Sequence, residues 1–203
     1  MPPNDPYAPP SAALGGPTPL EQFERDSGTL RYSTFWQRVG ASLIDFLILC
    51  PLIAFDYFLS GQSRMYHLYA LGPKELLNVF FFICMVVKFG GTPGKLIVGL
   101  RTVRQDGSPV NWKAACLRYA PWWALNLAIV TLTIGAALGM TDEAYKALGY
   151  LERSDAIGAQ APMVQPLTWL MMAWLFASVV TMLANSKCRT VHDFIAGTVV
   201  VRK

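Results

Sequence analysis

The sequence predicts an all-α membrane protein with four transmembrane helices, both termini cytoplasmic, and a small β-hairpin or strand element at the cytoplasmic surface. Three observations predict this fold class. First, 53% of the 203 residues are apolar and only 15% are charged, whereas soluble proteins carry about a quarter charged residues. Second, four apolar runs approach the roughly 20 residues that a spanning helix needs. Third, basic residues gather in alternate connections between these runs, which is typical of an oriented membrane protein.

Residues 1–34 are expected to form a disordered, Pro-rich cytoplasmic tail. Half of the chain's 14 prolines fall within residues 1–19. A segment of this composition buries too little apolar surface to offset the entropy that is lost on ordering. It also has no apolar run of the kind found in signal peptides, so the first span is expected to direct insertion and to stay in the protein. The membrane domain is then expected to cover residues 35–203.

The predicted spans cover about residues 35–59, 71–89, 114–138 and 167–184. The fourth span contains no charged residue and is the clearest of the four, whereas the start of the second is the least distinct. Four cysteines lie in or beside the spans, at positions 50, 84, 116 and 188. Their spacing matches neither a CxxC pair nor a metal site, so they are interpreted as small buried apolar side chains.

The distribution of charge predicts the orientation of the spans. The connection between the second and third spans is basic, with Lys88, Lys95, Arg101, Arg104 and Lys113 against one acid, Asp106. The C-terminal tail is basic as well. The connection at residues 141–165, by contrast, holds four acids and two bases. Because short basic connections stay in the cytoplasm, both termini are predicted to be cytoplasmic and the acidic connection to lie outside.

The first span carries charges that are unusual for a membrane helix. Arg38, Asp45 and Asp56 follow one another at intervals of seven and eleven residues, which places them within about 20° of each other on a helix. A charge deep in the bilayer costs about 2.5–3.5 kcal/mol on insertion scales, so such a face is expected to turn inward. Asp56 is expected near the outer interface, in contact with solvent.

Two residues elsewhere in the chain are candidate partners for these charges. Arg118, near the start of the third span, is expected at the depth of Asp45. Asp193, just after the fourth span, is expected at the cytoplasmic surface beside Arg38. Pairing Arg38 with Asp193 and Arg118 with Asp45 would satisfy both acids, and other pairings stay open. The charges could form an ion path, or they could only join helices.

A glycine-rich segment follows the second span. Its spacing does not match a Walker A phosphate loop, because three residues rather than four separate Gly90 from Gly94, and Leu96 rather than Ser or Thr follows Lys95. We interpret the segment as a tight turn built by Gly91, Pro93, Gly94 and Lys95, with positive φ at the two glycines.

The residues after this turn predict a β element. An Asp-Gly turn signal within the β-branched residues 96–112 indicates a hairpin, which would pair with a strand at Thr198–Val201. An amphipathic helix at the membrane surface is the alternative.

Three segments, in order, are "FWQRVGASLIDFLIL", "GGTPGKLIVGLRTVRQDGSPV" and "CRTVHDFIAGTVVV". Together they resemble the RDD family of multi-pass membrane proteins, over about residue 35 to the C-terminus. The resemblance implies a bacterial inner (plasma) membrane location, and it matches Arg38, Asp45 and Asp193 to the family's one arginine and two aspartates. It also implies two activities, because some members are reported to exchange sodium for protons and others look like accessory subunits. The resemblance also implies three spans, as in many members of the family, so the fourth span is a departure.

Two functions are consistent with these features. The first is a transporter that exchanges a monovalent cation for protons through the buried Arg38, Asp45, Asp193 and Arg118 network, which would need a homo-oligomer because four spans are few for alternating access. The alternative is a non-catalytic scaffold or assembly partner of another membrane protein. An enzyme is not expected, since His67 and His192 form no catalytic or metal-binding pattern. No cofactor, metal or nucleic acid is expected as a ligand, and the lipid bilayer is the expected surrounding.

Overall fold

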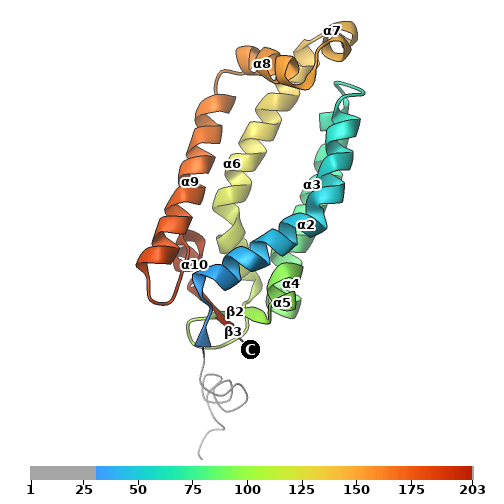
Figure 1. Ribbon diagram of the computed structural model, residues 1–203. Coiled ribbons are helices and arrows are strands. Elements are labelled where there is room, and N and C mark those ends of the chain that lie inside the picture. Colours follow the sequence, from blue (N-terminus) through green and yellow to red (C-terminus); the bar gives the residue numbers. More distant parts are fainter. Residues whose placement is uncertain (1–30, 203) are drawn as a thin grey trace, which may run out of the picture.

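The computed structural model describes residues 31–202, and Figure 1 shows four long helices standing side by side. All four are long and apolar enough to cross a membrane, so the chain is a multi-pass membrane protein, as predicted. The four spans are α2 (Phe35–Ser60), the continuous helix formed by α3 (Tyr66–Val79), η1 (Phe80–Cys84) and α4 (Met85–Phe89), α6 (Trp112–Gly139) and α9 (Val164–Ala184).

The second spanning helix differs most from its predicted bounds. It begins at Tyr66 rather than at residue 71, and it contains a π-helical segment over Phe80–Cys84. The start of α3 is hidden in the sequence because residues 66–70 hold two tyrosines and His67 rather than an apolar run. The other three spans begin and end within three residues of the predicted positions.

Local capping explains where two of the spans begin. Thr34 and Gln37 form a capping box at the start of α2, in which the Gln37 backbone N–H donates to the Thr34 hydroxyl over 3.4 Å and the Thr34 N–H donates to the Gln37 side chain over 3.0 Å. The side chain of Asn111 accepts from the N–H of Ala114 at the start of α6, over 2.9 Å. These caps fix the first turn of α2 and of α6, the two spans that carry Arg38 and Arg118.

A three-stranded antiparallel sheet lies at one end of the bundle. It contains β1 (Arg31–Tyr32), β3 (Thr198–Arg202) and β2 (Leu100–Arg104), in that order. The predicted pairing of the C-terminal strand with the segment after the second span is confirmed, with Thr102 opposite Val200.

The predicted hairpin over residues 96–112 is only partly right. Leu96 belongs to the short helix α5 (Pro93–Ile97), and the return arm of the hairpin is reduced to one bridge between Val103 and Pro109. The pairing partner of β2 is therefore β3 rather than its own neighbour in sequence.

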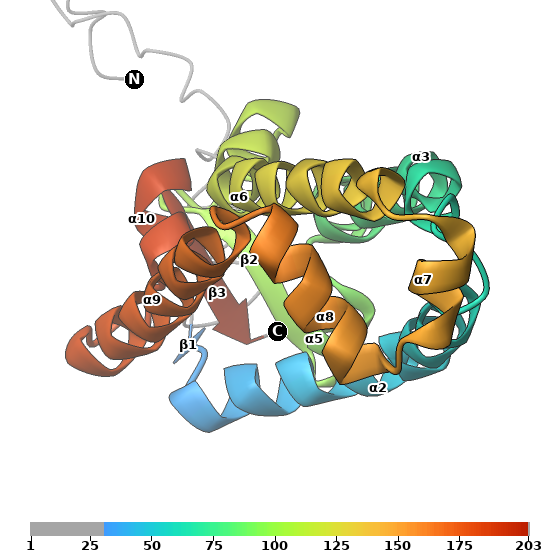
Figure 2. The same ribbon diagram turned by 90° about the horizontal axis from the view of Figure 1, so that it is seen from above.

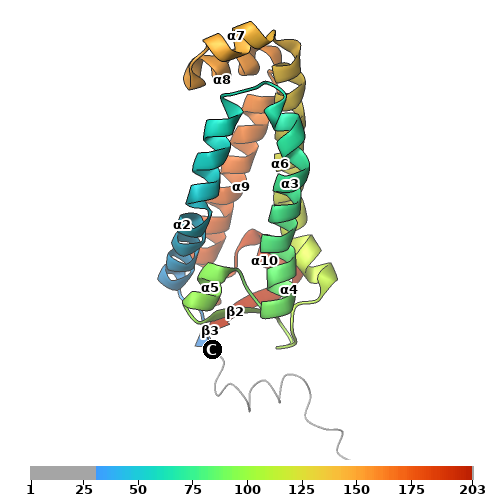
Figure 3. The same cartoon turned by 90° about the vertical axis from the view of Figure 1, so that its right-hand side faces the viewer.

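The sheet brings both ends of the described chain to the same end of the bundle. Strand β1 pairs with β3, so Arg31 lies opposite Arg202. An even number of spans requires this arrangement, and Figure 3 shows the sheet, α5 and α10 (Val191–Ala196) gathered there. We call this the sheet end. A disordered tail was expected over residues 1–34, and residues 1–30 of it lie outside the described residues. Arg31 and Tyr32 form β1, and Thr34 caps α2. The ordered part of the chain therefore begins before residue 35.

The opposite end carries the acidic connection. It forms two short helices, α7 (Asp142–Ala147) and α8 (Tyr150–Gln160), which lie across the ends of the spans in Figure 2. Tyr145 of α7 is fully buried there, and its hydroxyl donates to the carbonyl of Ser60 at the end of α2, over 2.8 Å. This contact joins the acidic connection to the first span.

The glycine-rich segment docks α5 directly against α2. The predicted tight turn at Gly91, Pro93, Gly94 and Lys95 is instead a one-turn helix that begins at Pro93, and the positive φ lies at Gly90 (81°). Gly94 is needed for close approach rather than for a turn, because a Cβ at this position would overlap the carbonyl oxygen of Ala41 on α2. The chain therefore places a residue without a side chain where α5 meets α2.

We predict that Gly94→Ala lowers the stability of the protein by about 1–3 kcal/mol, because the added methyl group forces two backbones apart. Gly40→Ala is the matched control, since Gly40 lies on α2, the helix that Gly94 contacts, and a Cβ at Gly40 meets nothing within 4 Å. The control should keep or raise stability by up to about 1 kcal/mol, as alanine is the better helix former. Thermal melting of both variants in one detergent measures the difference. Equal melting temperatures would contradict the close approach of α5 and α2.

Candidate functional site

The site is a buried cluster of charges at the sheet end, and Asp193 is its centre. Asp193 is the third residue of α10, and its side chain is fully buried. The sequence Thr190-Val-His-Asp forms a capping box, in which the Thr190 backbone N–H and hydroxyl donate to Asp193 Oδ2 over 3.1 and 2.9 Å. The start of α10 therefore fixes the carboxylate before any other helix contacts it.

Two arginines from different spans bind this carboxylate. Nη1 of Arg38 lies 2.7 Å from Oδ2 and Nη1 of Arg118 lies 2.9 Å from Oδ1, with all three side chains less than a tenth exposed. Thr198 at the start of β3 donates its hydroxyl to Oδ1 over 3.1 Å. One carboxylate thus ties α2, α6, α10 and β3 together, and the expected Arg38–Asp193 pair is present.

Further hydrogen bonds hold the cations in place. Nε of Arg38 donates to the hydroxyl of Ser33 over 2.8 Å, and the Ser33 backbone N–H donates to the carbonyl of Val200 over 3.0 Å. Arg189 donates to the backbone carbonyl of Thr198 over 3.2 Å and to that of Asp193 over 3.1 Å. The arginines therefore fasten both the side chain of Asp193 and the backbone around it.

The surroundings of Asp193 keep it ionised. Burial alone would raise the pKa of this carboxyl, but the positive charges of Arg118 and Arg38 outweigh burial and hold the pKa well below its usual range. A carboxylate with such a low pKa stays charged over the whole physiological range. Asp193 is therefore a permanent structural anion rather than a group that gains and loses protons.

His192 lies beside the cluster as a neutral side chain. Burial first, and then the positive charge of Arg118, lower its pKa to about 3. Arg118 Nη2 lies 3.2 Å from His192 Nε2, so the ring nitrogen accepts a hydrogen bond in the neutral tautomer that this contact implies. The ring faces Arg118, and in the described chain it makes no hydrogen bond to Asp193, so the two neighbours do not form an acid–base pair.

Asp45 is held separately from the arginines. Its Oδ2 accepts from the hydroxyl of Thr92 over 2.5 Å, and its Oδ1 accepts from the backbone N–H of Gly94 over 2.7 Å. The expected Arg118–Asp45 pair does not form. The physical reason is that the first turn of α5 offers unsatisfied N–H groups beside Asp45, while Arg118 is already engaged by Asp193.

Lys95 joins the cluster, although the sequence predicted it only as a turn residue. Its ammonium group lies within the electrostatic reach of Arg118, Asp193, Arg38 and Asp45. Among residues 31–202 it forms no salt bridge, and Nη2 of Arg38 is buried without a hydrogen-bond partner there. The cluster therefore carries more positive than negative charge. Helical geometry of α5 turns Lys95 inward, which a turn at this position would not predict.

Two further acids lie in the spans outside this cluster. Asp56 was expected to be solvated, but it is only a third exposed and pairs with Lys74 over 2.5 Å and with the Tyr66 hydroxyl over 2.6 Å. Glu75, which sequence reasoning missed, accepts from the indole N–H of Trp123 over 2.7 Å. Its position within α3 was the available signal, because an ionisable residue inside a span marks a functional candidate.

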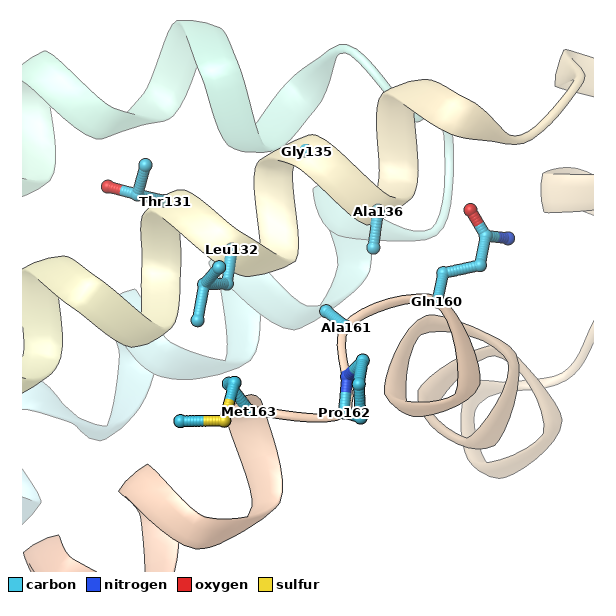
Figure 4. A pocket seen from close by; sticks show the side chains of 8 residues that line it. All are labelled: Thr131, Leu132, Gly135, Ala136, Gln160, Ala161, Pro162 and Met163. Carbon is cyan, nitrogen blue, oxygen red and sulfur yellow. The ribbon is translucent and has the colours of Figure 1, made fainter.

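A second region lies near the α7–α8 end and holds no charged side chain. It is a pocket of about 300 Å³ between α6 and the junction of α8 with α9, and Figure 4 shows Gln160 and Thr131 among mainly apolar neighbours. The Thr131 hydroxyl is bound to the carbonyl of Leu127. Within the described part of the chain, no three His, Cys, Asp or Glu side chains are close enough to hold a metal ion.

Comparison with known proteins identifies one family. The family model described as the RDD family matches residues 32–197. The matched range contains Arg38, Asp45 and Asp193, together with all four spans. No curated protein and no solved structure matches the chain.

We predict a pH-dependent loss of stability that is specific to His192. Its folded pKa of about 3 lies below the ordinary value of 6.5, so unfolding takes up a proton at intermediate pH. The stabilisation from this group is complete above pH about 6.5 and declines as the pH falls toward 3.

The test compares His67→Gln with His67→Gln/His192→Gln, because His192 is then the only histidine of the reference protein. Between pH 6.5 and 4.5 the reference should lose about 2 kcal/mol more than the double variant, measured by urea unfolding in detergent. Parallel stability curves for the two proteins would show that His192 is protonated in the folded state.

Proposed function

The chain belongs to the RDD family, and on that premise we propose that it is a membrane transport protein that exchanges a monovalent cation for protons. The proposal places it in a bacterial plasma membrane with the sheet end in the cytoplasm. The basic residues around β2 and β3, opposite the acidic α7–α8 connection, support this orientation. A homo-oligomer is part of the proposal, because four spans are few for alternating access.

One observation carries the proposal, namely that the two aspartates are held in different ways. Asp193 is bound by two guanidinium groups. If a transported cation replaced either arginine at this carboxylate, a contact between helices would break. Asp45 is bound by a neutral hydroxyl and a neutral amide, and it forms no salt bridge among the described residues. Such a carboxylate can accept a proton or a cation without breaking an ion pair.

Lys95 supports Asp45 in this role. Asp45 is among the charged groups that act on the Lys95 ammonium group, so a positive charge on Lys95 would compete with a cation for the carboxylate. A cation that binds Asp45 must repel Lys95, and loss of a proton from either group changes the balance. Cation binding and proton release would then be coupled at one place in the first span.

A second candidate function is a non-catalytic scaffold or assembly partner of another membrane protein. The hydrogen bonds to Asp45 favour it, because they also cap the N-terminal turn of α5 and dock it on α2. In this case the Arg38, Asp45 and Asp193 contacts only fix the shape of the sheet end. A catalytic role is not proposed in either case.

We predict that Asp45→Asn abolishes cation-dependent dissipation of a pH gradient in liposomes that contain the purified protein, since an amide can neither release a proton nor neutralise a cation. Asp155→Asn is the control, because Asp155 is exposed on α8. It should leave transport unchanged. Gel filtration and melting temperatures of both variants establish that they are folded before transport is measured.

Lys95→Gln is the second variant, and it should shift the pH of half-maximal exchange while leaving exchange detectable. If neither sodium nor potassium dissipates the gradient in liposomes that contain the wild-type protein, the transport proposal is contradicted. If a folded Asp45→Asn variant transports cations at the wild-type rate, Asp45 is excluded as the exchanging group. If Asp45→Asn never accumulates as folded protein, the scaffold function is favoured.

A further inference from the structure

Another pocket lies at the sheet end, outside the Arg–Asp cluster. We call it the edge pocket. It has a volume of about 600 Å³ and lies between α4, the end of α5, the edge strand β2 and the turn at residues 107–110. This volume is within the range of typical small-ligand sites. The side chains that matter for the argument are Val86, Val87, Lys88, Phe89 and Arg101.

The apolar part of the edge pocket comes from the end of a spanning helix. Val86, Val87 and Phe89 belong to α4, the last turn of the second span. Leu96 and Leu100 add apolar surface from α5 and β2. The pocket therefore lies where the hydrocarbon region of a bilayer meets the headgroup region, and it offers apolar surface on the bilayer side.

Two basic residues at the pocket are available for an anion. Lys88 and Arg101 are both exposed, and neither forms a salt bridge in the described part of the chain. Gly90 brings them together, because its left-handed backbone (φ 81°) ends α4 and the aliphatic carbons of Arg101 lie 3.7 Å from the position of a Cβ there. The two positive charges thus lie on either side of one turn.

Strand β2 forms one edge of the pocket, and its side chains alternate between two faces of the sheet. The Thr102 backbone N–H donates to the carbonyl of Gly90 over 2.6 Å, which holds β2 against the end of α4. Arg101 is exposed, whereas the side chain of Thr102, the next residue of the strand, is buried. Of these two residues, Arg101 is therefore the one whose side chain is available to a ligand.

We propose that the edge pocket binds an anionic phospholipid, with its phosphate group between Lys88 and Arg101 and an acyl chain along the apolar side. A phosphate oxygen accepts hydrogen bonds, which suits the two bases. The apolar surface of α4 selects a lipid over free phosphate, because an inorganic ion would leave that surface uncovered. The site is independent of the proposed transport, since it shares no residue with Arg38, Asp45, Asp193 and Arg118.

The test uses the full-length protein in a neutral detergent. Native mass spectrometry measures the binding of phosphatidylglycerol and of phosphatidylcholine with the same acyl chains. Phosphatidylglycerol should bind about tenfold more tightly, and Lys88→Gln/Arg101→Gln should remove that preference.

The matched control is Arg104→Gln/Lys113→Gln, which removes two bases from the same end of the protein but not from the pocket lining. It should leave binding unchanged. Equal binding of the two lipids, or an equal loss in the control, would overturn the proposal because the attraction would then be general. A third arm adds inorganic phosphate at millimolar concentration. Displacement of the lipid by phosphate alone would show that the pocket is a free-phosphate site.

Discussion

The fold depends on one carboxylate that is buried between two guanidinium groups. Asp193 lies after the last span, but it receives Arg38 from the first span and Arg118 from the third. Each charge would be strongly unfavourable in this place alone, so none of the three is tolerated without the others. This mutual requirement forces the C-terminal segment to fold back under the bundle. Once it does so, β3 is in position to pair with β1 and β2.

The sheet end is consequently a rigid assembly on which less constrained elements are built. Asp45 docks α5 on α2, and α5 carries Lys95 toward the arginines. The edge pocket forms where the same segment turns from α4 into β2. Above this end the spans present apolar side chains such as Leu47 and Phe176 outward, as a lipid surrounding requires. The salt-bridged charges around Asp193, the hydrogen-bonded carboxylate of Asp45 and the edge pocket therefore occupy neighbouring but separate places.

The sequence was most informative where one physical rule acts alone. Hydropathy located four spans, because length and composition decide whether a helix can cross a membrane. The seven-residue interval between Arg38 and Asp45 placed them on one face, and the position of Asp193 after the last span predicted its contact with Arg38. The β-branched residues around Val103 and Val200 predicted the strand pairing.

The sequence was least informative where several groups compete for one partner. Both Arg118 and the N–H groups of α5 could satisfy a carboxylate at the depth of Asp45, and only the packing of α5 on α2 decides between them. The role of Gly94 was misassigned for the same reason, because close approach of two backbones leaves no periodic signal. Glu75 and Lys74 were overlooked as intramembrane charges, since their pairing with Trp123 and Asp56 depends on how α3 sits against α6 and α2.

A double-mutant cycle on Arg38 and Asp193 tests most directly whether this pair determines the fold. Arg38→Gln, Asp193→Asn and the double variant are unfolded in the same detergent, with the exposed pair Arg104 and Asp106 as a reference cycle. We expect each single change at the buried pair to lower stability by about 3–5 kcal/mol, with a coupling of about 1–3 kcal/mol. The reference pair should give less than about 1 kcal/mol. Additive effects of Arg38→Gln and Asp193→Asn would contradict the account.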